Sequence, residues 1–320
     1  MSIGSLYKRI VLLSPRIEVM MRQIYWKNAV KFRKVAKDSH SHKGETPKHA
    51  DFNHLIDWLK FEGVGEGSLL VVHSSYEALE ATGLEPGCII ERLLNLVGNT
   101  GTLAMPAIRK YKGEPPYADR TGFEKLDIVC KYNTRKTKVS SGVLPYYMVL
   151  REDSEVSRYP LNPMVAIGPL AKEMMAHNID EEWSTPHGPN SAWKFCYDHN
   201  AIVVGLGASL EHYNTITHVA EEAFGDWYWP ADVWYCERTF DIVDGDFEKR
   251  INIRERKPYI GKMHFAEKNL YRDLLKNGIV KEDMIDNTIP VYIETAQGYI
   301  NYLRSKNKKG YPYFGNIKNR

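Results

Sequence analysis

Short apolar stretches alternate with amphipathic ones through the middle of this chain, and this alternation constrains the fold more than any other feature. Residues 52–61 and 87–98 place apolar side chains at helical spacing. Residues 69–72 and 102–105 are short apolar runs that each follow a glycine-containing turn, and residues 201–204 form a third such run. Strand, helix and strand joined by short turns are typical of a parallel α/β unit. The order of the segments therefore predicts one α/β body.

Polar residues follow the predicted strands, at the points where α/β folds bind ligands. His73, Ser74 and Ser75 come directly after the first strand. Hydroxyls and free backbone N–H groups at such a point suit a phosphate, although an ordinary capped helix start has the same residues. The Gly-Leu-Gly at 205–207 matches the opening of a dinucleotide-binding turn, but Leu210 stands where that motif needs its third glycine. These patterns indicate a polar site without identifying its ligand.

The stretch 214–221, NTITHVAE, holds the residues best suited to catalysis. If it opens a helix, Thr215, His218 and Glu221 follow one another at intervals of three and share one face. A histidine beside a carboxylate is a poised general base. Two other interpretations stay open. A zinc site would need further ligands that no motif spacing supplies, and a core histidine with a structural partner would show the same pattern.

Five blocks in order resemble the aminoglycoside 3-N-acetyltransferase family, from about Asp51 to about Glu222. The blocks are FEGVGEGSLLVVHSSYEAL, EPGCIIERLLNLVGNTGTLAMPA, TKVSSGVLPYYMVLREDSEVSRYPLNPMVAIG, HGPNSAW, and VVGLG followed by NTITHVAE. The resemblance implies a layered α/β/α sandwich, here with a helical N-terminal extension. It also implies an acyl-CoA-dependent N-acyltransferase that uses acetyl-CoA and no metal, with a small amino sugar rather than a nucleic acid as its partner.

The chemistry of N-acyl transfer assigns a role to each block. The attacking amine must be neutral and needs a base within reach, and we assign that role to His218, with Glu221 orienting its ring. Thr215 could donate to the thioester carbonyl or position the acceptor. A covalent acyl-enzyme on Ser74 or Cys130 is less favoured, because the sequence pairs neither with a base. Two strand-end blocks are assigned to the CoA pantetheine and pyrophosphate: His73, Ser74, Ser75, Val139, Ser140 and Ser141.

The acceptor is predicted from two departures from the family pattern. Tyr146 stands where members often have glutamate, and Tyr159 where they have histidine, while Lys136, Lys138 and Arg151 lie nearby. Polycationic aminoglycosides need carboxylates around them. We therefore expect Tyr146 and Tyr159 to contact a nucleotide-linked amino sugar of surface-glycan biosynthesis. The alternatives are an aminoglycoside resistance enzyme, with carboxylates supplied from elsewhere, and a non-catalytic CoA- or sugar-binding relative.

The first 50 residues carry 11 Lys and Arg against 3 Asp and Glu, a net charge of +8 in a chain of +3 overall. The Ser-Pro pair at 14–15 is typical of a helix start, and 38–47 of a linker. We therefore predict a basic helical extension, residues 1–50, and an N-acyltransferase domain, residues 51–320. The extension could pack on the body or on a second subunit of a homo-oligomer, or contact a membrane surface or another polyanion. For residues 254–320 we expect a lid or a subunit contact.

The lengths of the apolar runs and the spacing of the cysteines indicate in which compartment the protein resides. No apolar run approaches the roughly 20 residues that span a bilayer. The opening MSIGSLYKRIVLLSPR is interrupted too soon for a signal peptide. The 4 cysteines are widely spaced, which predicts free buried thiols in a reducing compartment. We expect a cytoplasmic protein without a transmembrane segment.

Overall fold

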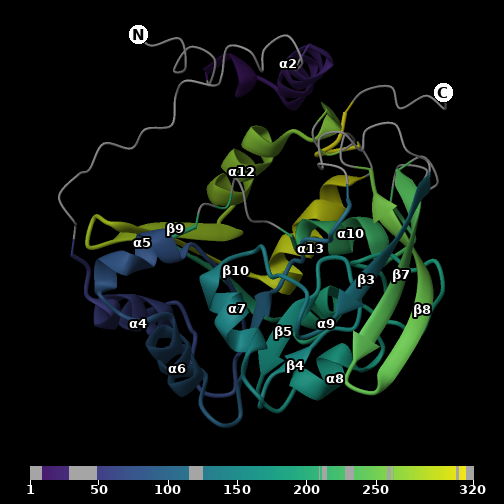
Figure 1. Cartoon of the computed structure of the whole chain (residues 1–320). Coiled ribbons are helices and arrows are strands. Elements are labelled where there is room, and N and C mark those ends of the chain that lie inside the picture. The colour runs from purple at the N-terminus through teal and green to yellow at the C-terminus, as the bar shows by residue number, and fades with distance from the viewer. Residues whose placement is uncertain are drawn as a thin grey trace.

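A seven-stranded sheet divides the protein into two layers of helices (Figure 1). Its strands are β1 (Leu69–Ser74), β2 (Thr102–Pro106), β4 (Glu155–Val156), β5 (Met164–Ile167), β6 (Ile202–Leu206), β9 (Val280–Ile285) and β10 (Ile289–Thr295). In this computed structural model their order is β4-β5-β2-β1-β6-β10-β9. β1 pairs in parallel with β2 and β6, and the outer pairings are antiparallel. The predicted parallel unit is confirmed for the three central strands.

The structure describes residues 9–28, 49–114, 125–208, 210, 215–227, 234–257, 261, 263–307 and 310–314.

Alternate residues of each central strand face opposite helical layers, as the two-residue period of a strand requires. Leu70 and Val72 pack into one apolar cluster, and Leu69 and Val71 into the other. The first layer holds α4 (Phe52–Phe61), α5 (Tyr76–Leu79), the 3₁₀ turn η2 (Glu80–Thr82), α6 (Pro86–Val97) and α7 (Val143–Val149). The second holds α8 (Ala171–Ala176), α9 (Ala192–Asp198), α10 (Thr217–Glu222), α12 (Glu267–Lys276) and α13 (Ala296–Asn307). The layered α/β/α sandwich is therefore confirmed, and α4 and α6 form where helices are predicted.

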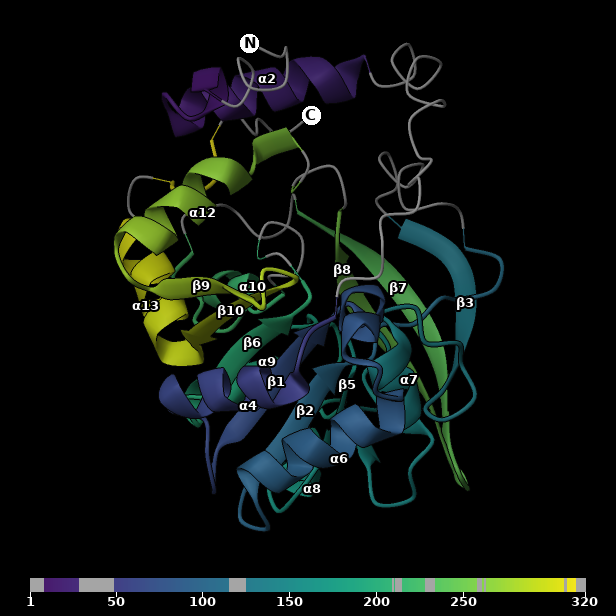
Figure 2. The same ribbon diagram turned by 90° about the vertical axis from the view of Figure 1, so that its left-hand side faces the viewer.

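A second, three-stranded sheet stands at one side of the sandwich and brings a distant segment to the candidate site (Figure 2). It consists of β3 (Lys125–Asn133), β7 (Tyr235–Asp244) and β8 (Phe247–Arg256), in the order β3-β7-β8. A two-residue turn joins β7 to β8, and Gly245 takes the positive φ, 60°, that such a turn needs. The last residue of β8 is Arg256, which the hairpin carries back to the central body.

The N-terminal helix α2 (Pro15–Lys27) begins where the Ser-Pro pair predicts it, with Ser14 as its N-cap. It packs on α12 through Glu18, whose side chain is fully buried. The Glu18 carboxylate accepts hydrogen bonds from the N–H of Lys268 at 2.8 Å and of Asn269 at 2.9 Å. These groups lie in the first turn of α12, whose own N-cap residue, Ala266, has no capping side chain. Glu18 therefore caps α12 from another helix.

The position of the domain boundary stays a prediction. The expected linker at 38–47 lies outside the described residues. Neither of the two large apolar clusters includes a residue before Ala50. That separation is consistent with an extension that packs on a complete body.

The described part of residues 254–320 belongs to the body, so the expectation of a lid was wrong there, while a subunit contact stays a prediction. β9 and β10 complete one edge of the central sheet. Tyr292, Tyr299 and Tyr313 are almost fully buried. The aromatic residues that suggested an exposed surface instead fill the interior.

Among the residues that the structure describes, no helix has the length and apolar character needed to cross a membrane. All four cysteines are free; three are buried, but Cys88 is exposed, against prediction.

Candidate active site

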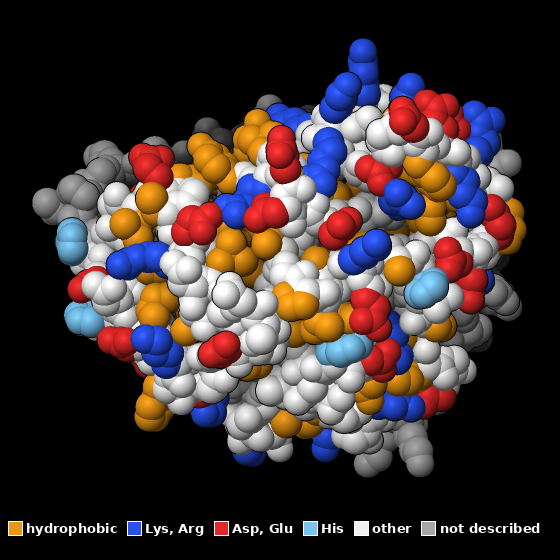
Figure 3. Space-filling model, turned by 90° about the horizontal axis from the view of Figure 1, so that it is seen from below, with side chains coloured by type: hydrophobic (Ala, Val, Ile, Leu, Met, Phe, Trp, Pro, Cys, Tyr) orange, Lys and Arg blue, Asp and Glu red, His pale blue; other side chains and the backbone are white. Residues whose placement is uncertain are grey.

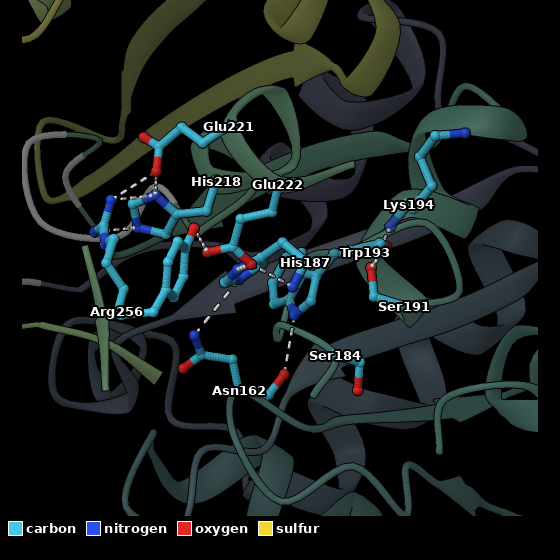
Figure 4. Close-up of polar contacts among 12 residues, drawn as sticks. Asn162, Ser184, His187, Ser191, Trp193, Lys194, His218, Glu221, Glu222 and Arg256 are labelled. Carbon is cyan, nitrogen blue, oxygen red and sulfur yellow. Dashed lines mark hydrogen bonds and ion pairs between the residues drawn. The ribbon is translucent and has the colours of Figure 1, made fainter. Parts of the chain in front are cut away.

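The predicted His218–Glu221 pair forms on the short helix α10. The Nδ1 atom of His218 lies 3.1 Å from Oε2 of Glu221 (Figure 4). The carboxylate is almost fully buried, whereas the imidazole is 20% exposed. Thr215 lies just before the helix rather than within it, because α10 begins at Thr217. The three-residue spacing thus places the base beside its carboxylate, with the imidazole partly exposed.

Arg256, from the end of β8, completes this cluster, and no sequence pattern pointed to it. Its guanidinium nitrogens lie 2.8 Å from Nδ1 and from Nε2 of His218, and one of them donates to Glu221 at 2.8 Å. The same guanidinium donates to the hydroxyl of Tyr313 at 2.7 Å, and Tyr313 donates to the second oxygen of Glu221. The Glu221 carboxylate therefore has partners on both oxygens.

Burial and charge set the protonation of the pair. Burial lowers the pKa of His218 below its ordinary value, and the positive charge of Arg256 lowers it further, while Glu221 opposes the shift. Burial would raise the pKa of Glu221, but Arg256 and His218 outweigh it and hold that pKa below its usual value. At neutral pH His218 is therefore neutral beside an ionised Glu221, which is the state a proton acceptor requires.

A second histidine–carboxylate pair lies next to the first. Glu222 accepts a hydrogen bond from the backbone N–H of His187 at 2.9 Å and from the hydroxyl of Tyr235 at 2.9 Å. Burial would raise the pKa of Glu222, but His187 lowers it to about 2. The rings of His187 and His218 meet edge to face, with centroids 5.1 Å apart. His187 lies in the HGPNSAW block. Its place in one of the blocks that resemble the family is the sequence feature that could have identified it as a site residue.

Trp193 ties this histidine cluster to the end of β1. Its buried indole lies against His187 on one side, at a centroid distance of 5.8 Å, and stacks on His73 at 6.1 Å on the other. Burial lowers the pKa of His73 to about 4, so this histidine is neutral. His73 thus contributes an uncharged wall.

Three cavities surround these residues. The His218 cavity, about 520 Å³, is lined by His187, His218 and Arg256 and by residues of α2, α12 and α13. The strand-end cavity measures about 630 Å³. The acidic cavity, about 360 Å³, lies behind Glu221 and Glu222 and also has Glu181 and Glu182 on its wall.

The residues assigned to CoA lie mostly together. The strand-end cavity brings together His73, Ser74, Ser75, Ser140, Ser141 and Thr215. Val139 does not line it and packs instead against the apolar core. The hydroxyls of Ser140 and Ser141 donate to main-chain carbonyls, so they shape the wall. The cavity fits the uncharged pantetheine arm better than the pyrophosphate, because the charged residues that line it are Glu77 and Glu80.

Neither tyrosine assigned to the substrate lines any of these three cavities. Tyr146 is 47% exposed on the outer face of α7. Tyr159 is buried, and its hydroxyl donates to the carbonyl of Ser184 at 2.8 Å. Their placement gives no support to the predicted substrate contacts.

Comparison with known proteins identifies the family. The family model described as aminoglycoside 3-N-acetyltransferase matches residues 71–297. Aminoglycoside N(3)-acetyltransferase IX of Micromonospora chalcea is 24% identical over 275 residues, which are 77% of this chain and 91% of that protein. The fold resembles AAC-IIIb binary with CoASH, at a TM-score of 0.60 and 18% identity over 82% of this chain and 97% of the other. It also resembles AAC-VIa bound to sisomicin, at a TM-score of 0.62 and 17% identity over 81% and 99%. The chain belongs to the aminoglycoside 3-N-acetyltransferase family and is an acyl-CoA-dependent N-acetyltransferase with acetyl-CoA as its cosubstrate.

Proposed function

We propose that the protein acetylates an amine of an aminoglycoside-type amino sugar, with His218 as the general base. One observation carries the proposal: Thr215 lines both the strand-end cavity and the His218 cavity. A thioester held at the strand ends and an amine held beside His218 would therefore meet at Thr215. Such a meeting point supplies the proximity on which acyl transfer depends.

Each residue of the site has a separate role in the proposed acetyl transfer. Acetyl-CoA supplies an activated acyl group. As the N–C bond forms, His218 takes the proton that the amine loses, and the ionised Glu221 stabilises the resulting imidazolium. The C–S bond of the thioester then breaks, and CoA leaves as the thiol after the imidazolium returns that proton to its sulfur. Arg256 holds both groups in place and keeps His218 neutral beforehand. The hydroxyl of Thr215 would donate to the carbonyl oxygen, where negative charge develops.

The carboxylates around the site favour a cationic acceptor over the nucleotide-linked sugar that the sequence suggested. Glu222, Glu255 and Glu267 line the His218 cavity. The acidic cavity next to it adds Glu181 and Glu182. Carboxylates are what a polycation needs around its non-reacting amines. These carboxylates belong to segments of the chain other than the one that contains Tyr146.

A nucleotide-linked amino sugar remains the second candidate, on one specific observation. The guanidinium groups of Arg22 and Arg256 line the same cavity, and arginine is well suited to a diphosphate. Both guanidiniums already pair with carboxylates, Arg22 with Glu18 and Glu267 and Arg256 with Glu221, which weakens this reading.

Acceptor kinetics test the proposal. With acetyl-CoA as donor, we expect kcat/KM for gentamicin or sisomicin to exceed that for nucleotide-linked amino sugars by about 100-fold or more, because the carboxylates that line the cavity would repel the diphosphate. The His218→Ala variant serves as the control for catalysed turnover. If a nucleotide-linked amino sugar matches or exceeds the aminoglycosides, the second candidate is correct.

The pH profile tests the role of Arg256. His218 must be neutral to accept a proton, so activity is lost as the pH falls through its pKa. Because Arg256 lowers that pKa and Glu221 raises it, Arg256→Met should move the acid limb of kcat/KM to higher pH. Arg256→Lys keeps the charge and should leave the limb near that of the wild type. Arg250→Met, which removes an exposed arginine from the same strand, is the matched control. If the acid limb of kcat/KM in Arg256→Met lies at the same pH as in the wild type, His218 is not the titrating base.

A further inference from the structure

The outward face of α2 is unusually apolar for an exposed helix. Met20, Ile24 and Tyr25 are 53%, 55% and 49% exposed, and Ile10 and Leu13, just before the helix, are 38% and 73% exposed. Ile17, Met20 and Ile24 follow the spacing of a single helical face. We refer to Ile10, Leu13, Met20 and Ile24 as the α2 stripe; Tyr25, seven residues after Glu18, begins the adjoining face. Apolar side chains gathered in this way on a surface are typical of an interaction site.

The orientation of the stripe is fixed by the opposite face of the helix. Val11, Glu18 and Val19 are almost fully buried, and Glu18 is held by the first turn of α12. In Figures 1 and 2, α2 lies at one end of the molecule, beyond α12. Since one face is committed to the body, the stripe points away from it.

Positive charge borders the stripe, because Arg9 and Arg16 are exposed and stand seven residues apart beside it. The first 50 residues carry a net charge of +8, and Glu18, one of their three acidic residues, is buried against α12. Residues 304–320 hold 6 Lys and Arg and no Asp or Glu. The ring of Phe314 lies 5.9 Å from the guanidinium of Arg16, so the C-terminal segment reaches α2.

The other end of the molecule has a different surface. Seen from below, it shows acidic and basic side chains interspersed, with hydrophobic side chains scattered between them (Figure 3).

We propose that α2 binds in the plane of an anionic lipid surface, with the stripe in contact with the acyl chains and Arg9 and Arg16 beside it in contact with the head groups. An apolar face bordered by Lys and Arg is the pattern of helices that lie in a membrane interface. A nucleic acid would use the positive charge but leave the stripe in water. Pairing of two copies through the stripe would bring two arms of +8 together, and their repulsion opposes it.

Vesicle binding by the full chain tests this proposal. We would compare sedimentation with vesicles of phosphatidylcholine alone and with about 30% phosphatidylserine, at about 0.1 M and 0.5 M salt, which changes the Debye length. We expect binding to the anionic vesicles only, and weaker binding at high salt. The triple variant Leu13→Ser, Met20→Ser, Ile24→Ser should bind about 10-fold or more weakly.

The matched control is Val129→Ser, Leu150→Ser, Met284→Ser, which removes three exposed apolar residues from other surfaces and should bind like the wild type. Absence of binding to anionic vesicles, or equal loss in the two triple variants, overturns the proposal. The proposal is also overturned if the protein does not bind vesicles and analytical ultracentrifugation shows a dimer that only the α2 triple variant abolishes. Both triple variants should acetylate a soluble amine as the wild type does, because none of the six residues lines a described cavity. Loss of vesicle binding with acetylation intact therefore concerns the membrane proposal alone and not the proposed function.

Discussion

Replacing His218 with alanine is expected to lower kcat by about 10²- to 10⁴-fold, the usual contribution of a positioned general base. The imidazole is the group in the His218 cavity that is held neutral by burial and by Arg256, and its carboxylate partner is already fixed 3.1 Å away. Steady-state kinetics at neutral pH, with calorimetric titration of CoA, would measure the effect. Binding of CoA should persist, because His218 lines the His218 cavity and not the strand-end cavity.

His54→Ala is the matched control, since His54 on α4 also pairs with a carboxylate, Asp286, at 2.8 Å but is exposed and remote from the cavities. Its kcat should equal that of the wild type. Glu221→Gln should cost less than His218→Ala, because the amide keeps the shape of the side chain and one acceptor oxygen. If His218→Ala retains activity within a few-fold, the base is a different residue. His187, whose ring centroid is 5.1 Å from that of His218, is then the first to test.

Replacing Trp193 with alanine is expected to reduce the free energy of unfolding by about 3 to 5 kcal/mol, as for other large-to-small changes at buried aromatic residues. Trp193 is 1% exposed, and its Nε1 donates to the carbonyl of Asn162 at 2.9 Å. The vacated space would lie between His73 and His187, which pack against the indole. Turnover should therefore fall together with stability, as His187 loses the surface that orients it.

Urea unfolding followed by circular dichroism would measure this change, with the transition midpoint and slope compared between variants. Trp183→Ala is the matched control, because Trp183 is 40% exposed and its removal should leave the unfolding midpoint near that of the wild type. A loss below about 1 kcal/mol in Trp193→Ala would show that the neighbouring rings close over the space.

Much of the central fold follows from local sequence patterns. The helical spacing at 52–61 predicts α4 with the bounds that it has, and the apolar runs at 69–72 and 102–105 predict β1 and β2. What fails are predictions that depend on where a side chain points. Tyr146 and Tyr159 follow each other closely in sequence, yet one lies on the surface and the other in the interior. Aromatic side chains are compatible with both environments, so their identity alone could not decide.

The sequence by itself determined the family, the parallel unit and the pairing of His218 with Glu221, because each of these depends on residues within one block or one turn of a helix. Only the tertiary structure brought Arg256 and Tyr313 to that pair, since they lie 35 and 92 residues beyond Glu221 in the chain. A contact between residues so far apart in the chain leaves no periodic pattern in the sequence. It depends on the β7–β8 hairpin and on the packing of the C-terminal segment, which place a guanidinium where it sets the charge of His218.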